Sequence, residues 1–415
     1  RPSRRSARRM RSKALLALLP AARAAPVDSH LRRWEARFLA DYPAAVCNDG
    51  SPAAYYYRPG LGWSPRRWLV FLEGGGWCWD NGTCAGQWAR KHSSSLHFPR
   101  DKKEVEIWSR RLTTGIFNSQ HSPLADARIA YVRQCSNDAY MGDAAPPRAP
   151  MYFRGRHIIE AVFADLRKRT GLGERRGDLL VYGGCSSGGR GAMVSLDYVA
   201  SELAGQADVL GVLDSALWVP VRPLGQAFPS FLEQTRMVME TANATFFISR
   251  ECRALFPDHP WKCLFGAFRL PLISTPYLLS QSQYDNFAIS VSVHGFYDPR
   301  PDLSALGLRW AEHYRQKVLE FLPRPGNNSG IAVFSSACYL HCTISHPQAM
   351  AFRAAGTSLP ELLERWLTAP SVTAATVEFR EDCSGFNCGS RLALDWKREK
   401  MAAARGLIER PLLQA

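Results

Sequence analysis

Short apolar runs alternate with longer amphipathic segments over most of the chain. The apolar runs are rich in Val, Leu, Ile and aromatic side chains, as buried strands are. They cover residues 68–72, 128–132, 178–182, 208–213, 271–279 and 331–334. Strands separated by helical segments predict an α/β fold, with a mostly parallel central sheet flanked by helices.

The amphipathic segments predict helices over residues 157–170, 188–204, 303–321 and 359–367. In the first of them, apolar side chains recur at helical spacing and share one face: Ile158, Ile159, Val162, Phe163 and Leu166. Nothing between residues 30 and 390 resembles an interdomain linker, and the proline-rich segments 144–150 and 323–328 predict surface loops. We therefore expect a single domain over residues 26–395, followed by a disordered tail at 396–415.

The first 25 residues concentrate positive charge, with seven Arg, one Lys and no acidic residue. The formal net charge of +15 falls to +7 without them, which leaves little support for nucleic-acid binding. After Met10, a candidate start, a basic segment precedes an apolar stretch at 14–22 and then small residues, the layout of a secretory signal peptide. An organelle transit peptide is the alternative. The apolar stretch is too short to span a bilayer, so we expect no membrane insertion.

Eleven cysteines favour a disulfide-stabilised protein from an oxidising compartment. Four pairs are close in sequence: Cys78/Cys84, Cys252/Cys263, Cys338/Cys342 and Cys383/Cys388. Structural zinc is the alternative, but the chain has no CxxC pair and Cys338-x-x-His341 lacks a second half-site, so we expect no metal. Three sequons support passage through the secretory pathway and mark candidate glycosylation sites at Asn81, Asn243 and Asn327.

A G-x-S-x-G motif follows the predicted strand 178–182 and precedes the predicted helix 188–204. It places Ser186 on a tight turn, where the hydroxyl would project above the sheet beside a helix N-terminus. A structural turn or a phosphate-cradling loop is the alternative, although no Lys-Ser/Thr pair follows the glycines as in a P-loop. We therefore predict that Ser186 is a nucleophile.

The two neighbours of Ser186 are expected to have other roles. Ser187 is off-centre in the motif, so we expect its backbone N–H, rather than its hydroxyl, to take part in chemistry. Cys185 is expected to point into the packing beside the turn. With eleven cysteines, we predict that Cys185 is the one thiol outside a disulfide.

A glycine-rich segment, Gly74-Gly-Gly76, follows the predicted strand 68–72. Consecutive glycines let backbone N–H groups approach an oxyanion without obstruction by a Cβ atom. A flexible loop is the alternative, but the bulky Trp77-Cys78-Trp79 that follows favours a fixed loop. The segment is a candidate oxyanion loop.

The chain order Ser, Asp or Glu, then His is the order in α/β-hydrolases. His341 follows the predicted strand 331–334 and is flanked by cysteines, which favours it as the base over His346 and over His313 in a predicted helix. Asp285 follows the extended run 271–279 and is the candidate acid. Asp298 and Asp302 are the alternatives.

Taken together, these segments resemble the pectin acetylesterase/Notum family. They occur in the family order, as residues 71–78 with Cys84, 184–189, Asp214-Ser215, Tyr284-Asp285 and 338–342. The resemblance implies an α/β-hydrolase-like fold, secretion, disulfides and ester hydrolysis without a cofactor. It implies Ser186 as nucleophile, His341 as base and Asp285 as its orienting acid. Backbone N–H groups of Gly75, Gly76 and Ser187 would form the oxyanion hole.

The resemblance is greater to the plant-type pectin acetylesterase branch, because of the GGGWC run and Cys185. This resemblance implies an extracellular, cell-wall serine esterase that removes O-acetyl groups from a polysaccharide such as pectin, and we expect it to be a monomer. A net charge near +7 would favour a polyanionic galacturonan. The alternatives are a Notum-like deacylase of a lipidated protein and a catalytically silent carbohydrate-binding member of the fold, with nucleic-acid binding third.

Overall fold

The computed structural model describes residues 33–389, with gaps at 62–65, 119–121, 147–150, 226–227, 301, 325–329, 347–352, 355 and 369–376. The expected signal segment 1–25 and the expected tail 396–415 lie outside the described residues. Within the described part, no helix is both long enough and apolar enough to cross a membrane.

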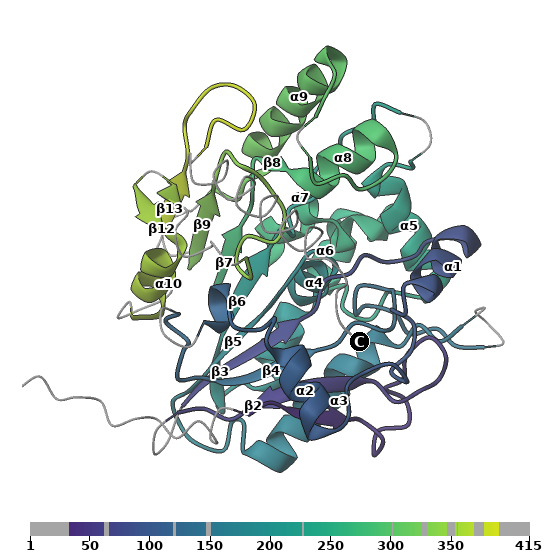
Figure 1. The fold of residues 1–415 in the computed structure, drawn as a ribbon, viewed down its shortest axis with the longest axis vertical. Coiled ribbons are helices and arrows are strands. Elements are labelled where there is room, and N and C mark those ends of the chain that lie inside the picture. The colour runs from purple at the N-terminus through teal and green to yellow at the C-terminus, as the bar shows by residue number, and fades with distance from the viewer. Residues whose placement is uncertain are drawn as a thin grey trace, which may run out of the picture.

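A nine-stranded sheet runs through the molecule in the order β1-β2-β4-β3-β5-β6-β7-β9-β13 (Figure 1). Its strands are β1 (Glu35–Phe38), β2 (Ala54–Arg58), β3 (Arg67–Leu72), β4 (Arg128–Val132), β5 (Asp178–Cys185), β6 (Ala207–Asp214), β7 (Tyr277–Ser280), β9 (Ile331–Ser335) and β13 (Val377–Arg380). β2 pairs antiparallel with β1 and β4, and every other pair is parallel. The predicted α/β fold with a mostly parallel sheet is confirmed.

Each predicted apolar run contains a strand, but the run at 271–279 is a strand only from Tyr277 onward. Its first part belongs to a short 3₁₀ helix, Leu270–Leu272, with a proline in the first turn. Proline fixes φ near a helical value and has no N–H to donate, so it suits the start of a helix better than a sheet ladder.

All four predicted helices are present, as α3 (Gly155–Thr170), α4 (Ser187–Glu202), α9 (Ala305–Phe321) and α10 (Leu359–Thr368). The other helices are α1 (Asn81–Ala89), α2 (Lys102–Ser109), α5 (Phe231–Ala242), α6 (Arg250–Leu255), α7 (Gly266–Arg269) and α8 (Asn286–His294). Short 3₁₀ turns occur at Gly115–Phe117 and Pro260–Leu264. Two small sheets pair β8 (Tyr284–Asp285) with β10 (Tyr339–Leu340), and β11 (Arg353–Ala354) with β12 (Thr357–Ser358).

Both faces of the sheet are buried, as the alternation of side chains along β5 shows. Leu180 and Tyr182 pack into one core with residues of α3 and α4, whereas Val181 packs into a second core with residues of α2 and α10. Successive side chains of a strand point to opposite faces, so a strand that is apolar throughout requires cover on both. Because β5 and β6 are parallel, their carboxyl ends lie side by side at the same end of this buried sheet.

Five disulfides are present among the described residues: Cys47–Cys135, Cys78–Cys84, Cys185–Cys342, Cys252–Cys263 and Cys383–Cys388. Three of the four cysteine pairs that are close in sequence are bonded, namely Cys78–Cys84, Cys252–Cys263 and Cys383–Cys388. Cys342 of the fourth close pair is bonded to Cys185 instead of Cys338. The prediction that Cys185 is the thiol outside a disulfide is therefore wrong. Cys185 ends β5 with its Cα 5.5 Å from that of Cys342, whereas Cys338 is buried in the core that contains α10.

Candidate active site

Ser186 lies in the tight turn between β5 and α4. Its backbone has φ 58° and ψ −124°, a conformation that non-glycine residues rarely adopt. The Ser186 N–H donates to the Asp214 carbonyl at 3.0 Å, and its own carbonyl accepts from Arg190 N–H at 2.9 Å. This is the strained strand-to-helix turn that the G-x-S-x-G motif predicts.

Close backbone contacts around Ser186 require glycine both in the turn and in the loop after β3 that lies against it. A Cβ atom added to Gly188 would lie 2.2 Å from the Leu72 carbonyl oxygen. One added to Gly74 would lie 2.7 Å from the Cys185 carbonyl oxygen and 3.1 Å from Ser186 Cβ. The glycines of both motifs therefore allow the loop after β3 to lie directly against the turn.

Replacing Gly188 with alanine should damage both folding and activity. The new methyl group would meet backbone atoms of Leu72, which cannot rotate away. We expect a loss of about 1–3 kcal/mol in unfolding free energy, the usual cost of overpacking. The matched control is Gly86→Ala in α1, where no atom lies within 4 Å of the new Cβ and alanine is the better helix former. Urea unfolding would measure both, and equal midpoints for the two variants would contradict the packing argument.

The loop after β3 is held through its carbonyl groups. Gln87 Nε2 donates to the Gly75 carbonyl at 3.1 Å, and Gln134 Nε2 donates to the Gly76 carbonyl at 2.8 Å. Gly75 and Gly76 have φ of 155° and 82°, and the second value is one that favours glycine. Because both carbonyls are bound, the orientation of these peptide groups is fixed.

The N–H groups of this loop remain available. Among the described residues, the backbone N–H groups of Gly75, Gly76 and Ser187 make no hydrogen bond. Ser187 is the first residue of α4, where a helix leaves its N–H groups unsatisfied. Such donors in a fixed arrangement can stabilise a developing oxyanion, so these three residues stay the candidate oxyanion hole.

His341 and Asp285 are joined by a short hydrogen bond. His341 Nδ1 lies 2.7 Å from Asp285 Oδ2, and both side chains are largely buried. The parallel pair β8·β10 sets this approach, since Leu340 lies opposite Asp285 in register. Asp285 Oδ1 accepts from Ala288 N–H at 2.9 Å and caps α8, so both carboxylate oxygens are fixed.

The alternative residues lie elsewhere. Asp298 pairs with Arg300 at 2.7 Å, Asp302 is exposed, and His313 is exposed on α9. The histidine that bonds to Asp285 is His341, five residues before His346. The structure thus brings together the predicted acid and the predicted base and does not favour their alternatives.

Opposing effects act on the imidazole of His341. Burial lowers its pKa, but attraction by Asp285, the hydrogen bond with Asp285 and attraction by Asp214 outweigh burial and leave the pKa raised. The Nε2 atom is buried and has no hydrogen-bond partner among the described residues, so it is not bonded to Ser186. Catalytic hydrogen bonds are often long before substrate binds. The Phe287 ring, with its centroid 5.3 Å away, packs against the imidazole.

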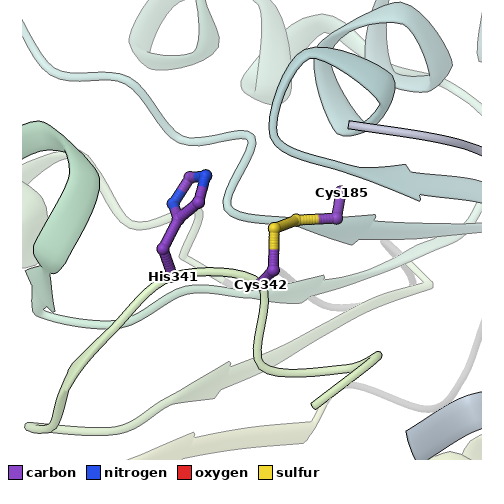
Figure 2. A group of neighbouring side chains, drawn as sticks. All are labelled: Cys185, His341 and Cys342. Atoms are coloured by element: carbon purple, nitrogen blue, oxygen red, sulfur yellow. A yellow bond between two sulfur atoms is a disulfide. The ribbon is translucent and has the colours of Figure 1, made fainter. Parts of the chain in front are cut away.

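Figure 2 shows His341 beside the Cys185–Cys342 disulfide, with Cys342 on the same loop and Cys185 at the end of a strand. Their side-chain nitrogen and sulfur atoms lie within 4.8 Å of one another. Metal binding by cysteine requires thiolate sulfur, and both sulfurs here are consumed by the disulfide. The cluster therefore joins the residue before Ser186 to the residue after His341.

A small enclosed cavity adjoins His341 and Asp285. Its volume is about 10 Å³, the space that a single water molecule occupies. The apolar part of its wall consists of Leu217, Trp218, Val219, Phe231, Phe287, Ala288 and Tyr314. Trp218 and Phe231 stack edge to face with centroids 3.8 Å apart, so bulky rings close this side of the site.

Some features of the site could not be found from sequence patterns. Gln87 and Gln134 hold the loop after β3, although both are distant in sequence. Gln87 lies 12 residues from its partner Gly75, and Gln134 lies 58 residues from its partner Gly76. Asp214 and Ser215 contact the loop that carries His341. The Asp214-Ser215 pair is one of the segments that resemble the family, but no sequence pattern predicted which residues it contacts.

The chain is similar to known carboxylic ester hydrolases. The chain is 28% identical over 341 residues to palmitoleoyl-protein carboxylesterase NOTUM of Homo sapiens, a match that covers 78% of this chain and 64% of the human protein. It is 27% identical over 318 residues to pectin acetylesterase 11 of Arabidopsis thaliana, covering 72% and 76% of the two chains. These identities do not separate the two branches.

The fold is also that of a solved relative. The structure of the Wnt deacylase Notum from Drosophila matches with a TM-score of 0.73 at 25% identity, covering 86% of this chain and 99% of that one. In the sequence comparison with the human protein, by contrast, the match covers 64% of that relative, so this chain spans less than two thirds of its full length. The pectinacetylesterase family model matches residues 32–383, most of the sequence. This chain belongs to the pectinacetylesterase family.

Proposed function

We propose that this protein is a secreted serine carboxylester hydrolase that removes O-acetyl groups from a cell-wall polysaccharide such as pectin. The Asp285–His341 hydrogen bond beside the strained Ser186 turn is the observation that carries the proposal. Relatives named as a carboxylesterase and as an acetylesterase support ester hydrolysis as the reaction.

The proposed reaction uses only side chains and backbone of this chain. Nε2 of His341 takes the proton of Ser186 Oγ, which attacks the acetyl carbonyl, while Asp285 orients and stabilises the imidazolium. The oxyanion accepts hydrogen bonds from backbone N–H groups of the loop after β3 and of Ser187. The sugar alcohol leaves with the proton from His341. Water, deprotonated by His341, then releases acetate and regenerates Ser186.

The closed surroundings of His341 favour a small acyl group. Long acyl chains need apolar space, and each buried CH₂ contributes about 0.8 kcal/mol to binding. The cavity of about 10 Å³ beside His341 holds no chain of several methylenes unless the Trp218 and Phe231 rings move.

An open groove nearby fits a polysaccharide chain. It has a volume of about 800 Å³, and its lining includes the aromatic Phe228 and Trp261, the cationic Arg222 and Arg236 and the acidic Glu233. Arg236 also pairs with Glu240 at 3.1 Å, which leaves Arg222 as the cation with no acidic partner among the ion pairs of the described residues. Phe228 contacts Phe231, which lines the cavity beside His341, at a centroid distance of 5.6 Å. Arginine and aromatic rings suit acidic sugars, through carboxylate pairing and stacking on sugar faces.

A Notum-like deacylase is the second candidate. It is favoured by the apolar and aromatic lining of the cavity and by the relatives named as palmitoleoyl-protein carboxylesterases. On this alternative, ring rotation would open a long acyl pocket.

Hydrolysis of acetate, butyrate and octanoate esters of one chromophore separates the candidates. We expect the highest kcat/KM with acetate and a steep fall by octanoate, because the cavity is closed by bulky rings. The same preparation should release acetate from acetylated pectin, and more slowly after methyl-esterification removes the galacturonate charge. Ser186→Ala protein is the background control. A preference for octanoate, with no acetate released from any polysaccharide, would favour the deacylase.

Secretion to the cell wall and a monomeric state belong to the same proposal. Of the three sequon asparagines, Asn81 and Asn243 are exposed, as glycosylation requires. Asn327 lies outside the described residues. The five disulfides agree with an oxidising compartment.

A further inference from the structure

Asp214 is a buried carboxyl group that the reaction proposed above does not use. It ends β6 and is completely inaccessible to solvent. Its Oδ1 accepts from Thr343 N–H at 3.2 Å and its Oδ2 accepts from Ile344 N–H at 2.7 Å. Both carboxyl oxygens thus bind consecutive backbone groups just after His341.

Ser215 extends this set of contacts by one residue. Its Oγ accepts from Cys342 N–H at 3.0 Å, and its backbone has φ of 54°, a strained value for serine. Two adjacent residues at the end of β6 therefore bind three consecutive N–H groups, those of Cys342, Thr343 and Ile344. Strain of this kind persists where the surrounding contacts require it.

The end of β6 at Asp214 also binds the turn that carries Ser186. The Asp214 carbonyl oxygen accepts from Ser186 N–H at 3.0 Å. The Cys185–Cys342 disulfide adds a covalent link between the residue before Ser186 and the residue after His341. Ser186 and His341 are 155 positions apart in the chain, so their relative placement depends on these few contacts.

We propose that Asp214 and Ser215 are positioning residues, which fix the loop after His341 so that the imidazole stays aligned with Ser186. The inference rests on the proposed Ser186–His341–Asp285 triad. Misplacement of a catalytic group by about 1 Å can cost on the order of 10²-fold in rate. A loop held at three successive backbone groups restricts such movement.

The charge of Asp214 also acts on the base. Burial raises the pKa of Asp214 to about 7, against the opposing effects of the Ile344 N–H, the attraction of His341 and the Thr343 N–H. Attraction by Asp214 in turn contributes to the raised pKa of His341. The ionisable groups facing this pair are Asp285, which caps α8, and Tyr314 of α9, whose phenol is neutral because burial raises its pKa. His341 and Asp214 therefore titrate as a coupled pair.

The test compares Asp214→Asn and Ser215→Ala with Asp178→Asn, using an aryl acetate and the full chain. Asp178 is also a buried carboxyl that accepts a backbone N–H, from Gly173, but it begins β5 at the opposite end of the sheet from Ser186. In Asp214→Asn, an amide NH₂ would face a backbone N–H. We expect kcat to fall about 10²-fold with KM within about 3-fold. Ser215→Ala should lose about 10-fold in kcat, and Asp178→Asn less than about 3-fold.

The pH profile distinguishes positioning of the base from a general structural role. The wild-type enzyme loses activity as pH falls through the coupled titration of His341 and Asp214. Asp214→Asn removes an attraction that favours the imidazolium, so the acid limb should move to lower pH. The inference is overturned if the acid limb is unmoved, or if kcat falls no further than in Asp178→Asn. If Asp214→Asn does not fold, Ser215→Ala provides the test. A fall in kcat of about 10-fold with KM nearly unchanged would support the positioning role, and an unchanged kcat would overturn it.

Failure of the inference is distinguishable from failure of the proposed function. Full activity of Ser186→Ala would refute the triad itself. An inactive Ser186→Ala together with a fully active, soluble Asp214→Asn would refute only the positioning role. Because the substrate is an aryl acetate, the outcome does not depend on the natural ester.

Discussion

Ser186→Ala should lower kcat for an aryl acetate by roughly 10³-fold or more, because removal of a triad nucleophile leaves only substrate binding and the oxyanion hole. The hydroxyl sits on a strained turn with φ 58°, and alanine accepts that backbone about as well as serine. The hydrogen bond from residue 186 N–H to the Asp214 carbonyl is retained, so the fold should be unaffected. Stopped assays at equal, independently measured protein concentrations of variant and wild type would measure the loss.

Ser187→Ala is the matched control for this result. Its Oγ is buried and has no hydrogen-bond partner among the described residues, so the hydroxyl contributes no bond that alanine would lose. Its proposed contribution is the backbone N–H, which alanine keeps. We expect kcat within about 5-fold of wild type, since removal of a buried hydroxyl that makes no hydrogen bond breaks no interaction. An inactive Ser187→Ala beside an active Ser186→Ala would show that the motif register is wrong.

The central strands and helices of this fold are predictable because each is buried in a regular way, the strands on both faces and the helices on one. β5 and β6 are buried on both faces, and a strand covered on both faces reads as a continuous apolar run. α3 shows a clear apolar face and ends at Gly171, whose φ of 71° is the left-handed value that helix C-caps favour. Local sequence and tertiary packing agree at these elements.

The edge of the sheet is not signalled by the same pattern. β1 is four residues long and half exposed, and β2 is entirely buried although it ends in Arg58. That arginine is accommodated by the carbonyls of Phe117 and Ala125, which lie far away in sequence. Partners at such separations are a tertiary property and leave no periodic pattern near the strand.

The disulfides likewise fall into two groups, one of short and one of long sequence separation. Three of them join cysteines 5 to 11 residues apart, whose closeness is visible in the sequence, whereas Cys47–Cys135 and Cys185–Cys342 span 88 and 157 residues. Spacing cannot reveal long-range connectivity. The prediction that Cys185 stays outside a disulfide fails because its side chain, one residue before Ser186, packs in the core that contains α10, where the loop after β10 brings Cys342.

Asp285→Asn should lower kcat by about 10⁴-fold, the effect of an amide at the orienting position of a triad. Asparagine keeps an oxygen that can accept from Ala288 N–H and cap α8, so the helix should be retained. Its NH₂ group would instead face His341 Nδ1 and favour the imidazole tautomer with the proton on Nε2. That tautomer cannot accept the proton of Ser186.

The pH dependence of the residual activity gives a second readout. Asp285 raises the pKa of His341 by attraction and by their hydrogen bond, while burial lowers it. Without the carboxylate, the balance moves toward burial and the pKa of His341 falls. The acid limb of kcat/KM, which marks protonation of the base in the free enzyme, should therefore move to lower pH.

Asp298→Asn is the control for the choice of acid. Asp298 pairs with Arg300, hydrogen bonds from which hold its pKa at about 2, and it makes no contact with His341 among the described residues. Loss of this exposed pair costs little, so we expect kcat within about 3-fold of wild type. If Asp298→Asn were the inactive variant and Asp285→Asn retained kcat with an unchanged acid limb, the acid would be misassigned. The short Asp285–His341 hydrogen bond would then be structural, holding β8 and β10 in register rather than orienting the base.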